Sequence, residues 1–193
     1  MTEGTARERI LAVADDLFYQ RGIQAVGIDE IVSRSAVAKT TLYWHFKSKD
    51  QLVASYLRRR SDHWRAYVED ALTRHPGPAA AQIDVIFKLL AAGCADPRFR
   101  GCPFINAAAE FPDPAHPARI VIAEHRAWLH DLFAGIASSA HAPEPDTLAS
   151  WLLMLYDSAM TSTQLGPDRA AAAQALGAAR VLVAASCRTP VTV

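Results

Sequence analysis

The sequence lacks the signals of several classes of protein. Its three cysteines, Cys94, Cys102 and Cys187, are odd in number and form no CxxC pair, so neither a disulfide framework nor a zinc site is expected. The most apolar stretch, Leu148 to Met160, is too short to span a bilayer and contains Asp157. The N-terminal residues are charged, with no apolar signal region behind them. We therefore expect a cytoplasmic protein that does not contact a membrane.

Motifs of the common enzyme and cofactor sites are also missing. The chain contains no GxGxxG, P-loop, HExxH, GxSxG or paired-carboxylate arrangement. His116, His125 and His130 suggest a metal site at first, but residues 125 and 130 are five apart and point to different faces of a helix. We predict no catalytic residue, no metal site and no cofactor, so an enzyme with an all-α body is the weaker alternative.

Lysine is scarce, and its distribution along the chain is uneven. The 193 residues carry no net charge and include four lysines, of which Lys39, Lys47 and Lys49 fall between Gly27 and Asp50. Residues 1–60 contain 10 basic and 7 acidic side chains, whereas the remainder contains 10 and 13. This asymmetry favours a basic, nucleic-acid-binding part attached to an acidic regulatory part, because a phosphate backbone attracts clustered cations.

The stretch from Gly27 to Asp50 predicts a helix-turn-helix hairpin. Its apolar residues repeat at helical spacing on either side of a break at Ser35 and Ala36. The second helix would display donors and flat rings around a single buried Leu42, a surface that suits base edges and phosphates. The apolar positions are Ile28, Ile31, Val32, Leu42 and Phe46, and the displayed residues are Lys39, Thr40, Thr41, Tyr43, Trp44 and His45.

At these residues the chain resembles the TetR family of bacterial transcriptional regulators, and the run TTLYWHFKSKDQL is the most specific match. The resemblance is close up to about residue 50 and general beyond it. It implies a homodimer that binds double-stranded operator DNA and releases it when a small-molecule effector occupies the C-terminal domain. By position, it also implies that Lys39, Thr40 and Tyr43 approach base edges or the adjoining backbone, and that Thr41, Trp44, His45 and Lys49 hold phosphates or support the helix.

Three positions in the hairpin depart from the pattern of that family. Gly27 and Ala38 stand where the family usually has a Ser or Thr that caps a helix, and Ala36 stands where the turn usually has Gly. A lost cap costs about 1 kcal/mol, and Ala at positive φ costs roughly 1 kcal/mol. We expect the hairpin to form, because it packs on the preceding helix, and its turn to be less rigid.

Helical periodicity predicts an all-α chain of two domains, with a three-helix helix-turn-helix domain over residues 1–50 and a helical effector-binding and dimerisation domain over residues 51–193. The first helix begins at a capping box of Thr5 and Glu8 and ends at Gly22. A second capping box, Ser48 and Gln51, begins a long connecting helix that ends at Pro76. Further helical segments are predicted over 79–94, 118–137, 146–165 and Asp168 to Cys187, and a short apolar run occupies 103–111.

The expected effector site lies among aromatic residues of the middle helices and Asn106, the only asparagine in the chain. A buried amide between Phe104 and three alanines requires a partner, which is either an effector or a neighbouring helix end. The predicted effector-binding residues are Phe87, Cys102, Phe104, Asn106, Phe111, Trp128 and Trp151.

The last two predicted helices are rich in small and apolar residues. Alanines such as Ala172, Ala175 and Ala179 allow helix backbones to approach closely. This pair of helices is similar to the four-helix dimer interface of the TetR family, which implies a homodimer through the last two helices. An intramolecular bundle is the alternative.

Taken together, these features predict a ligand-responsive, sequence-specific DNA-binding regulator that acts as a repressor. One alternative is a redox or electrophile sensor, in which Arg98 and Arg100 stabilise the thiolate of Cys102. An unreactive, small apolar role is the simpler explanation of Cys102. A second alternative, a helical adaptor that binds only protein, leaves the clustered lysines unexplained.

Overall fold

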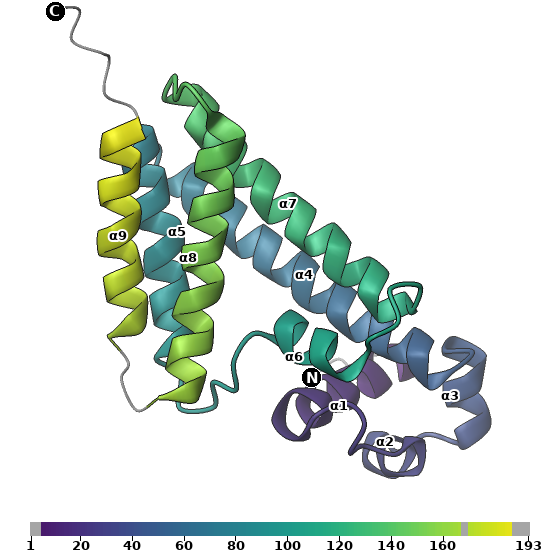
Figure 1. Cartoon of the computed structure of the whole chain (residues 1–193). Helices are drawn as coiled ribbons and strands as arrows, with labels where there is room; N and C mark the ends of the chain where they lie inside the picture. Colours follow the sequence, from purple (N-terminus) through teal and green to yellow (C-terminus); the bar gives the residue numbers. More distant parts are fainter. Residues whose placement is uncertain (1–4, 167–169, 187–193) are drawn as a thin grey trace, which may run out of the picture. The chain divides into compact units, whose positions relative to one another are not determined.

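The computed structural model describes residues 5–166 and 170–186, and all regular secondary structure in these ranges is helical (Figure 1). The predicted all-α fold is confirmed. The helices are α1 (Ala6–Arg21), α2 (Ile28–Ser35), α3 (Lys39–His45), α4 (Lys49–Arg74), α5 (Ala79–Cys94), α6 (Pro103–Glu110), α7 (Pro117–Ser139), α8 (Pro145–Leu165) and α9 (Ala171–Ser186). The predicted limits of the last helix, Asp168 and Cys187, lie outside the described residues.

The chain divides into two compact units, each of which is built from two separate segments of the sequence. The first unit comprises Met1–His63 and Pro103–Glu124, and the second comprises Trp64–Cys102 and His125–Val193. Helices α4 and α7 each begin in the first unit and end in the second. Helix α6 therefore belongs to the unit that contains the hairpin, although the residues before it belong to the other unit.

Helix α1 has the start and the end that its sequence predicts. Thr5 Oγ1 accepts the N–H of Glu8 at 3.3 Å, and Glu8 Oε2 accepts the N–H of Thr5 at 2.8 Å, which completes the capping box. Gly22 ends the helix at φ +88°, and its N–H donates to the carbonyl of Phe18. Leu17 and Phe18 on the inner side of the helix are buried, as in an amphipathic helix that covers a core.

The hairpin of α2 and α3 is built without side-chain caps. Neither Gly27 nor Ala38 makes a side-chain capping hydrogen bond, and Ala36 takes the left-handed conformation at φ 51° and ψ 47°. The departures expected at these three positions are therefore confirmed. The Ser35 hydroxyl donates to the carbonyl of Ile31 at 2.6 Å, which satisfies a polar side chain that is buried at the end of α2.

Helix α4 begins with half of the predicted capping box. The N–H of Gln51 donates to Ser48 Oγ at 3.2 Å. The helix then continues without interruption to Arg74, just before the predicted stop at Pro76. None of the described helices is both long enough and apolar enough to cross a lipid bilayer.

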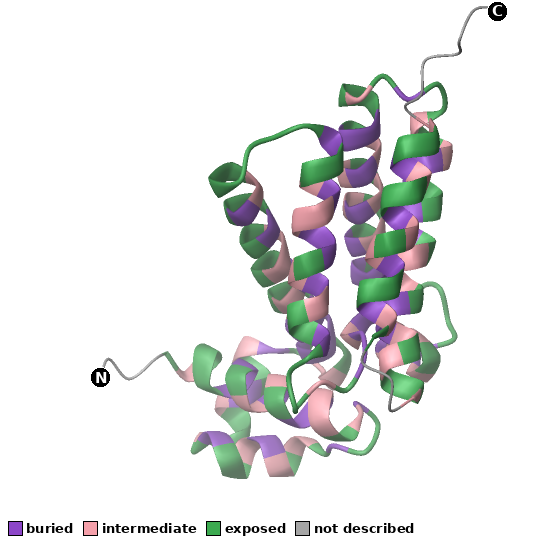
Figure 2. Cartoon of the chain, turned by 90° about the vertical axis from the view of Figure 1, so that its left-hand side faces the viewer, coloured by how far each residue is buried: buried purple, intermediate pink, exposed green. Residues whose placement is uncertain are grey.

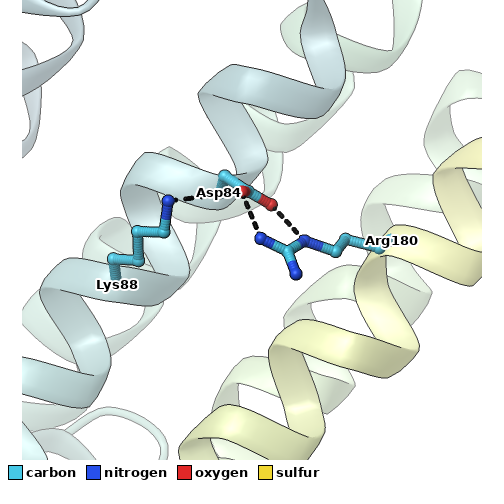
Figure 3. A network of polar contacts seen from close by, with 3 residues as sticks. All are labelled: Asp84, Lys88 and Arg180. Atoms are coloured by element: carbon cyan, nitrogen blue, oxygen red, sulfur yellow. Dashed lines mark hydrogen bonds and ion pairs between the residues drawn. The ribbon is translucent and has the colours of Figure 1, made fainter.

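Helices α5, α8 and α9 pack along one another in the second unit (Figure 1). Buried and exposed positions alternate with the helical repeat (Figure 2), and Ala172, Ala175 and Ala179 lie on the buried side of α9. The guanidinium of Arg180 on α9 binds Asp84 on α5 with Nε 2.7 Å from Oδ1, while Lys88 Nζ lies 3.4 Å from Oδ2 (Figure 3). The hydrogen bond from Arg180 lowers the pKa of Asp84.

Candidate nucleic-acid interface

Helix α3 exposes four of its seven side chains. Leu42 is its one fully buried residue, and the adjoining Phe46 anchors its C-terminal end in the core. Trp44 is 73% exposed and Tyr43 is 41% exposed. Lys39 and Thr40 are also exposed, and Thr41 and His45 are half-buried. An exposed pair of large rings has no role in the core, so this face is available to a partner.

Neighbouring side chains restrain the two ends of α3. Lys39 Nζ lies 2.7 Å from Asp29 Oδ1 of α2, and this hydrogen bond raises the pKa of the lysine. The ring of His45 packs edge-on against Trp44, with 4.5 Å between the ring centroids. Lys49, half-buried at the start of α4, has its pKa lowered by burial. The ion pair with Asp29 therefore holds Lys39 in a defined position at the start of α3.

The end of α6 and the segment that follows it contact the loop after α1 and the start of α4. Both oxygens of Glu110 accept backbone hydrogen bonds from the loop after α1, from Ile23 at 2.9 Å and from Gln24 at 2.7 Å. His116 stacks on Phe111 with 4.0 Å between centroids, and its Nε2 lies 3.3 Å from Asp50 Oδ1. Sequence reasoning missed Glu110, because a single acidic residue at a helix end has no distinctive pattern.

The predicted effector-binding residues are divided between the two units. Phe104, Asn106 and Phe111 lie in the first unit, where Phe104 and Phe111 are buried and Asn106 is half-buried. The second unit contains Phe87 and Cys102, both buried, the half-buried Trp128 and the exposed Trp151.

Within the second unit, Phe87 belongs to an aromatic cluster that also contains Trp64, Phe133 and Tyr156. Phe87 lies 6.3 Å from both Phe133 and Tyr156, and Trp64 lies 6.5 Å from Tyr156, measured between ring centroids. Periodicity identified neither Trp64 nor Tyr156 as a site residue, because a core position explains an aromatic residue in a helix equally well. The cluster is visible only once four helices are assembled.

The cluster contains two buried polar groups, the indole N–H of Trp64 and the hydroxyl of Tyr156. Among the described residues, Trp64 Nε1 is the buried side-chain nitrogen or oxygen without a hydrogen-bond partner. The Tyr156 hydroxyl lies close enough to interact electrostatically with the indole, but the two groups do not reach hydrogen-bond geometry. Burial raises the pKa of Tyr156. An unpaired buried donor is unusual in a folded protein and marks a place where a ligand atom can bind.

Elsewhere in the second unit, the buried imidazole of His125 lies near Trp128 on α7. His125 is 4% exposed, and its ring centroid lies 5.7 Å from that of Trp128. Burial, with the positive charges of Arg65 and Arg126, lowers the pKa of His125 to about 4. The described residues contain no group of three or more His, Cys, Asp or Glu that is placed to hold a metal ion.

The cysteines of the described chain are buried. Burial raises the pKa of the Cys94 thiol, and Cys102 is likewise shielded from solvent. Limited access slows the reaction of a thiol with an oxidant, so burial disfavours a sensor that acts through Cys102. Cys187 lies outside the described residues.

Comparison with known proteins assigns this architecture to a family. A family model described as "Bacterial regulatory proteins, tetR family" matches residues 10–56, which include most of α1 and all of α2 and α3. The crystal structure of a TetR-family transcriptional regulator from Streptomyces coelicolor superposes with a TM-score of 0.89 at 33% identity, and the match covers 95% of this chain and 96% of that one. The chain belongs to the TetR family.

Two curated regulators are similar to this TetR-family chain over shorter stretches. The HTH-type transcriptional activator FasR of Mycolicibacterium smegmatis is 41% identical over 66 residues, which are 34% of this chain and 30% of that protein. The HTH-type transcriptional regulator LmrA of Bacillus subtilis is 31% identical over 80 residues, which are 41% of this chain and 43% of that protein. The match thus spans less than half the length of either relative.

Membership of the TetR family establishes the general role of the chain. It is a transcriptional regulator whose DNA-binding element is the helix-turn-helix formed by α2 and α3. Its relatives are regulators and not enzymes.

Proposed function

We propose that this TetR-family protein is a ligand-responsive repressor. Two copies form a homodimer, and their α3 helices enter successive major grooves about 34 to 36 Å apart. A small molecule that binds the C-terminal domain favours an arrangement that no longer fits the operator. The observation that carries the proposal is the exposed face of α3, where Tyr43 and Trp44 lie open to solvent above a single buried leucine.

Base reading and backbone contact are divided along that face. Lys39, Thr40 and Tyr43 approach base edges or the adjoining backbone, because they project from the first turns of α3 and are exposed. The remaining contacts to phosphates come from Thr41, Trp44, His45 and Lys49. In the free protein the Lys39 ammonium is bound to Asp29. A DNA phosphate competes with Asp29 for this ammonium.

Dimer formation uses the outer sides of α8 and α9. Large apolar residues remain exposed there, namely Trp151, Met154 and Leu165 on α8 and Val181 on α9. The alanines that the sequence suggested for close helix approach are buried within the protomer, so they bring α9 against its own bundle. A second copy on the opposite side of these helices covers the exposed apolar residues and forms a symmetric interface.

The effector binds at the aromatic cluster of the second unit. Phe87, Phe133 and Tyr156 supply apolar contact, and the unpaired N–H of Trp64 supplies a donor. A buried donor without a partner costs about 1 to 3 kcal/mol. A ligand with an apolar body and a hydrogen-bond acceptor offsets this cost, and it binds better where the acceptor reaches the indole.

The effector signal reaches the hairpin through covalent crossings between the units and through Glu110. The chain passes from one unit to the other after His63, Cys102 and Glu124. The crossing after Cys102 leads directly into α6, whose last residue, Glu110, holds the N–H groups of Ile23 and Gln24. A displacement of α6 therefore moves the loop that supports α2.

Fluorescence anisotropy tests the proposal. Binding to DNA that flanks the protein's own gene is compared with binding to a scrambled duplex, because regulators of this kind often control neighbouring genes. We expect selective binding by the wild type and loss of that selectivity in Tyr43→Ala. Tyr67→Ala is the matched control, since Tyr67 is 45% exposed and lies in the second unit.

Two outcomes would contradict the proposal. If neither duplex binds at low salt while helical content is intact, the chain is not an operator-binding protein, and a protein-binding adaptor becomes the better explanation. If Tyr43→Ala and Tyr67→Ala reduce selectivity equally, α3 does not read the bases. With a selective duplex available, the same assay screens small molecules for release.

A further inference from the structure

An open, charged groove runs along the first unit between α1 and α4. It encloses about 710 Å³, and its walls carry Arg7, Glu8 and Arg9 from α1 and Arg58, Arg59 and Asp62 from α4. The groove lies outside the exposed face of α3. None of the DNA contacts proposed above uses it.

Positive charge predominates in this groove. The lining residues include four arginines and two acidic residues, and one of the acidic residues, Glu8, already accepts the N–H of Thr5 in the capping box. Arg58 reaches a third carboxylate, Glu124, at 3.9 Å, but both side chains are more than half exposed and this pair is weak. An excess of arginine side chains favours the binding of an anion, and their planar donors match the oxygens of a phosphate.

The groove adjoins the C-terminal ends of both helices of the recognition hairpin. The guanidinium carbon of Arg7 lies 5.3 Å from the ring centroid of Phe46, the residue that ends α3. Arg9 Nε lies 3.5 Å from the carbonyl oxygen of Ser35, the last residue of α2. One wall of the groove therefore begins where the helix-turn-helix rests on α1.

We propose that this groove binds phosphates of the DNA backbone that α3 and Lys49 do not reach. Arg58 lies nine residues beyond Lys49 on α4, or about 13 Å along the helix axis, so the two side chains meet different phosphates. The groove is open and six of its ten lining residues are charged, which suits a duplex backbone better than a small apolar ligand. This inference rests on the operator binding proposed above.

The salt dependence of DNA binding tests this proposal. In anisotropy titrations at several salt concentrations, Arg58→Ala/Arg59→Ala should lower the slope of log K against log salt by about 0.9 for each phosphate that the variant no longer neutralises. It should weaken binding to the operator and to a scrambled duplex by similar factors, because the DNA backbone carries no base information. Arg58→Lys/Arg59→Lys keeps both charges and should retain most of the slope.

A control with the same loss of charge separates local binding from overall electrostatics. Arg74→Ala/Arg98→Ala removes two arginines from the second unit. If this control lowers the slope as much as the groove variant does, the groove has no specific role and the proposal is overturned. If wild-type protein shows no duplex binding at all, the operator-binding proposal itself fails, which is a separate result.

A third arm distinguishes the DNA backbone from a free phosphate ligand. Inorganic pyrophosphate is titrated by calorimetry against the wild type and against Arg58→Ala/Arg59→Ala. Pyrophosphate binding that disappears in the variant, together with an unchanged DNA slope, would assign the groove to a small phosphate ligand and overturn the proposal. A reduced DNA slope with intact helical content supports it.

Discussion

The recognition hairpin and the bundle of the second unit place their aromatic residues in opposite surroundings. Tyr43 and Trp44 project into solvent from a helix with one buried leucine, whereas Phe87, Phe133 and Tyr156 are buried against one another. Packing does not explain an exposed ring on a short helix, so its role in binding can be predicted from the sequence. A buried ring is fully explained by packing, so any ligand it also contacts leaves no trace in the sequence.

The largest effect that we expect is a loss of stability at low pH, caused by His125, which is buried in the second unit. Its pKa of about 4 lies below the ordinary value of 6.5, so the unfolded chain binds more protons between these values. Stability should therefore fall as pH falls from about 6.5 to 4, by about 3 kcal/mol in all. Urea unfolding at a series of pH values measures this loss.

His125→Leu removes the titrating group from the same buried position and should flatten the pH profile in this window. His75→Gln, at the exposed end of α4, is the matched control and should keep the profile of the wild type. If His125→Leu loses stability toward pH 4 as steeply as the wild type does, the buried imidazole is not the group responsible.

A smaller effect is expected where the hairpin depends on a distant segment. Glu110→Gln replaces one of the two oxygens that accept the N–H groups of Ile23 and Gln24 with a donor. Since hydrogen bonds to charged groups contribute about 1.5 to 3 kcal/mol and this carboxylate is only half-buried, we expect a loss of about 1 kcal/mol. Thermal unfolding measures the loss, and anisotropy measures the accompanying weaker operator binding.

Glu124→Gln is the control for that change, because Glu124 pairs with Arg58 at 3.9 Å on the exposed surface. It should alter stability by less than about 0.5 kcal/mol. If the two variants lower stability equally, the hydrogen bonds of Glu110 to the loop after α1 do not stabilise the hairpin.

The smallest effect is expected at the turn of the hairpin, and its sign is opposite. Ala36 holds φ at 51°, a conformation that Gly adopts without strain. Ala36→Gly should therefore stabilise the protein by up to about 1 kcal/mol, as measured by urea unfolding. Ala91→Gly, inside α5, should instead destabilise by about 1 kcal/mol. A destabilising Ala36→Gly would mean that the entropy of the unfolded chain outweighs the strain at this turn.

Local features of the fold follow from short stretches of the sequence. The capping box of Thr5 and Glu8, the stop at Gly22 and the left-handed Ala36 each depend on interactions within a few residues. The exposed face of α3 follows from the spacing of Leu42 and Phe46 in the same way. The helices predicted within residues 5–166 were confirmed for this reason, within a few residues at their ends.

Contacts between distant residues could not be read from the sequence in this way. Nothing near Glu110 indicates that it binds Ile23, which is 87 residues away. Nothing in the periodicity of α4 indicates that Trp64 lies beside Tyr156, or that its N–H lacks a partner there. Apolar spacing shows which face of a helix is buried but not which other helix covers it.

The sequence by itself therefore determined the all-α class, the recognition hairpin and the residues that the hairpin displays, because helix periodicity, caps and turns act over one or two turns of chain. Only the tertiary structure decided that α6 belongs with the hairpin, that four aromatic residues form one cluster, and that arginines from α1 and α4 line one groove. These features arise when separate helices pack, and packing is chosen by the shape and burial of whole surfaces.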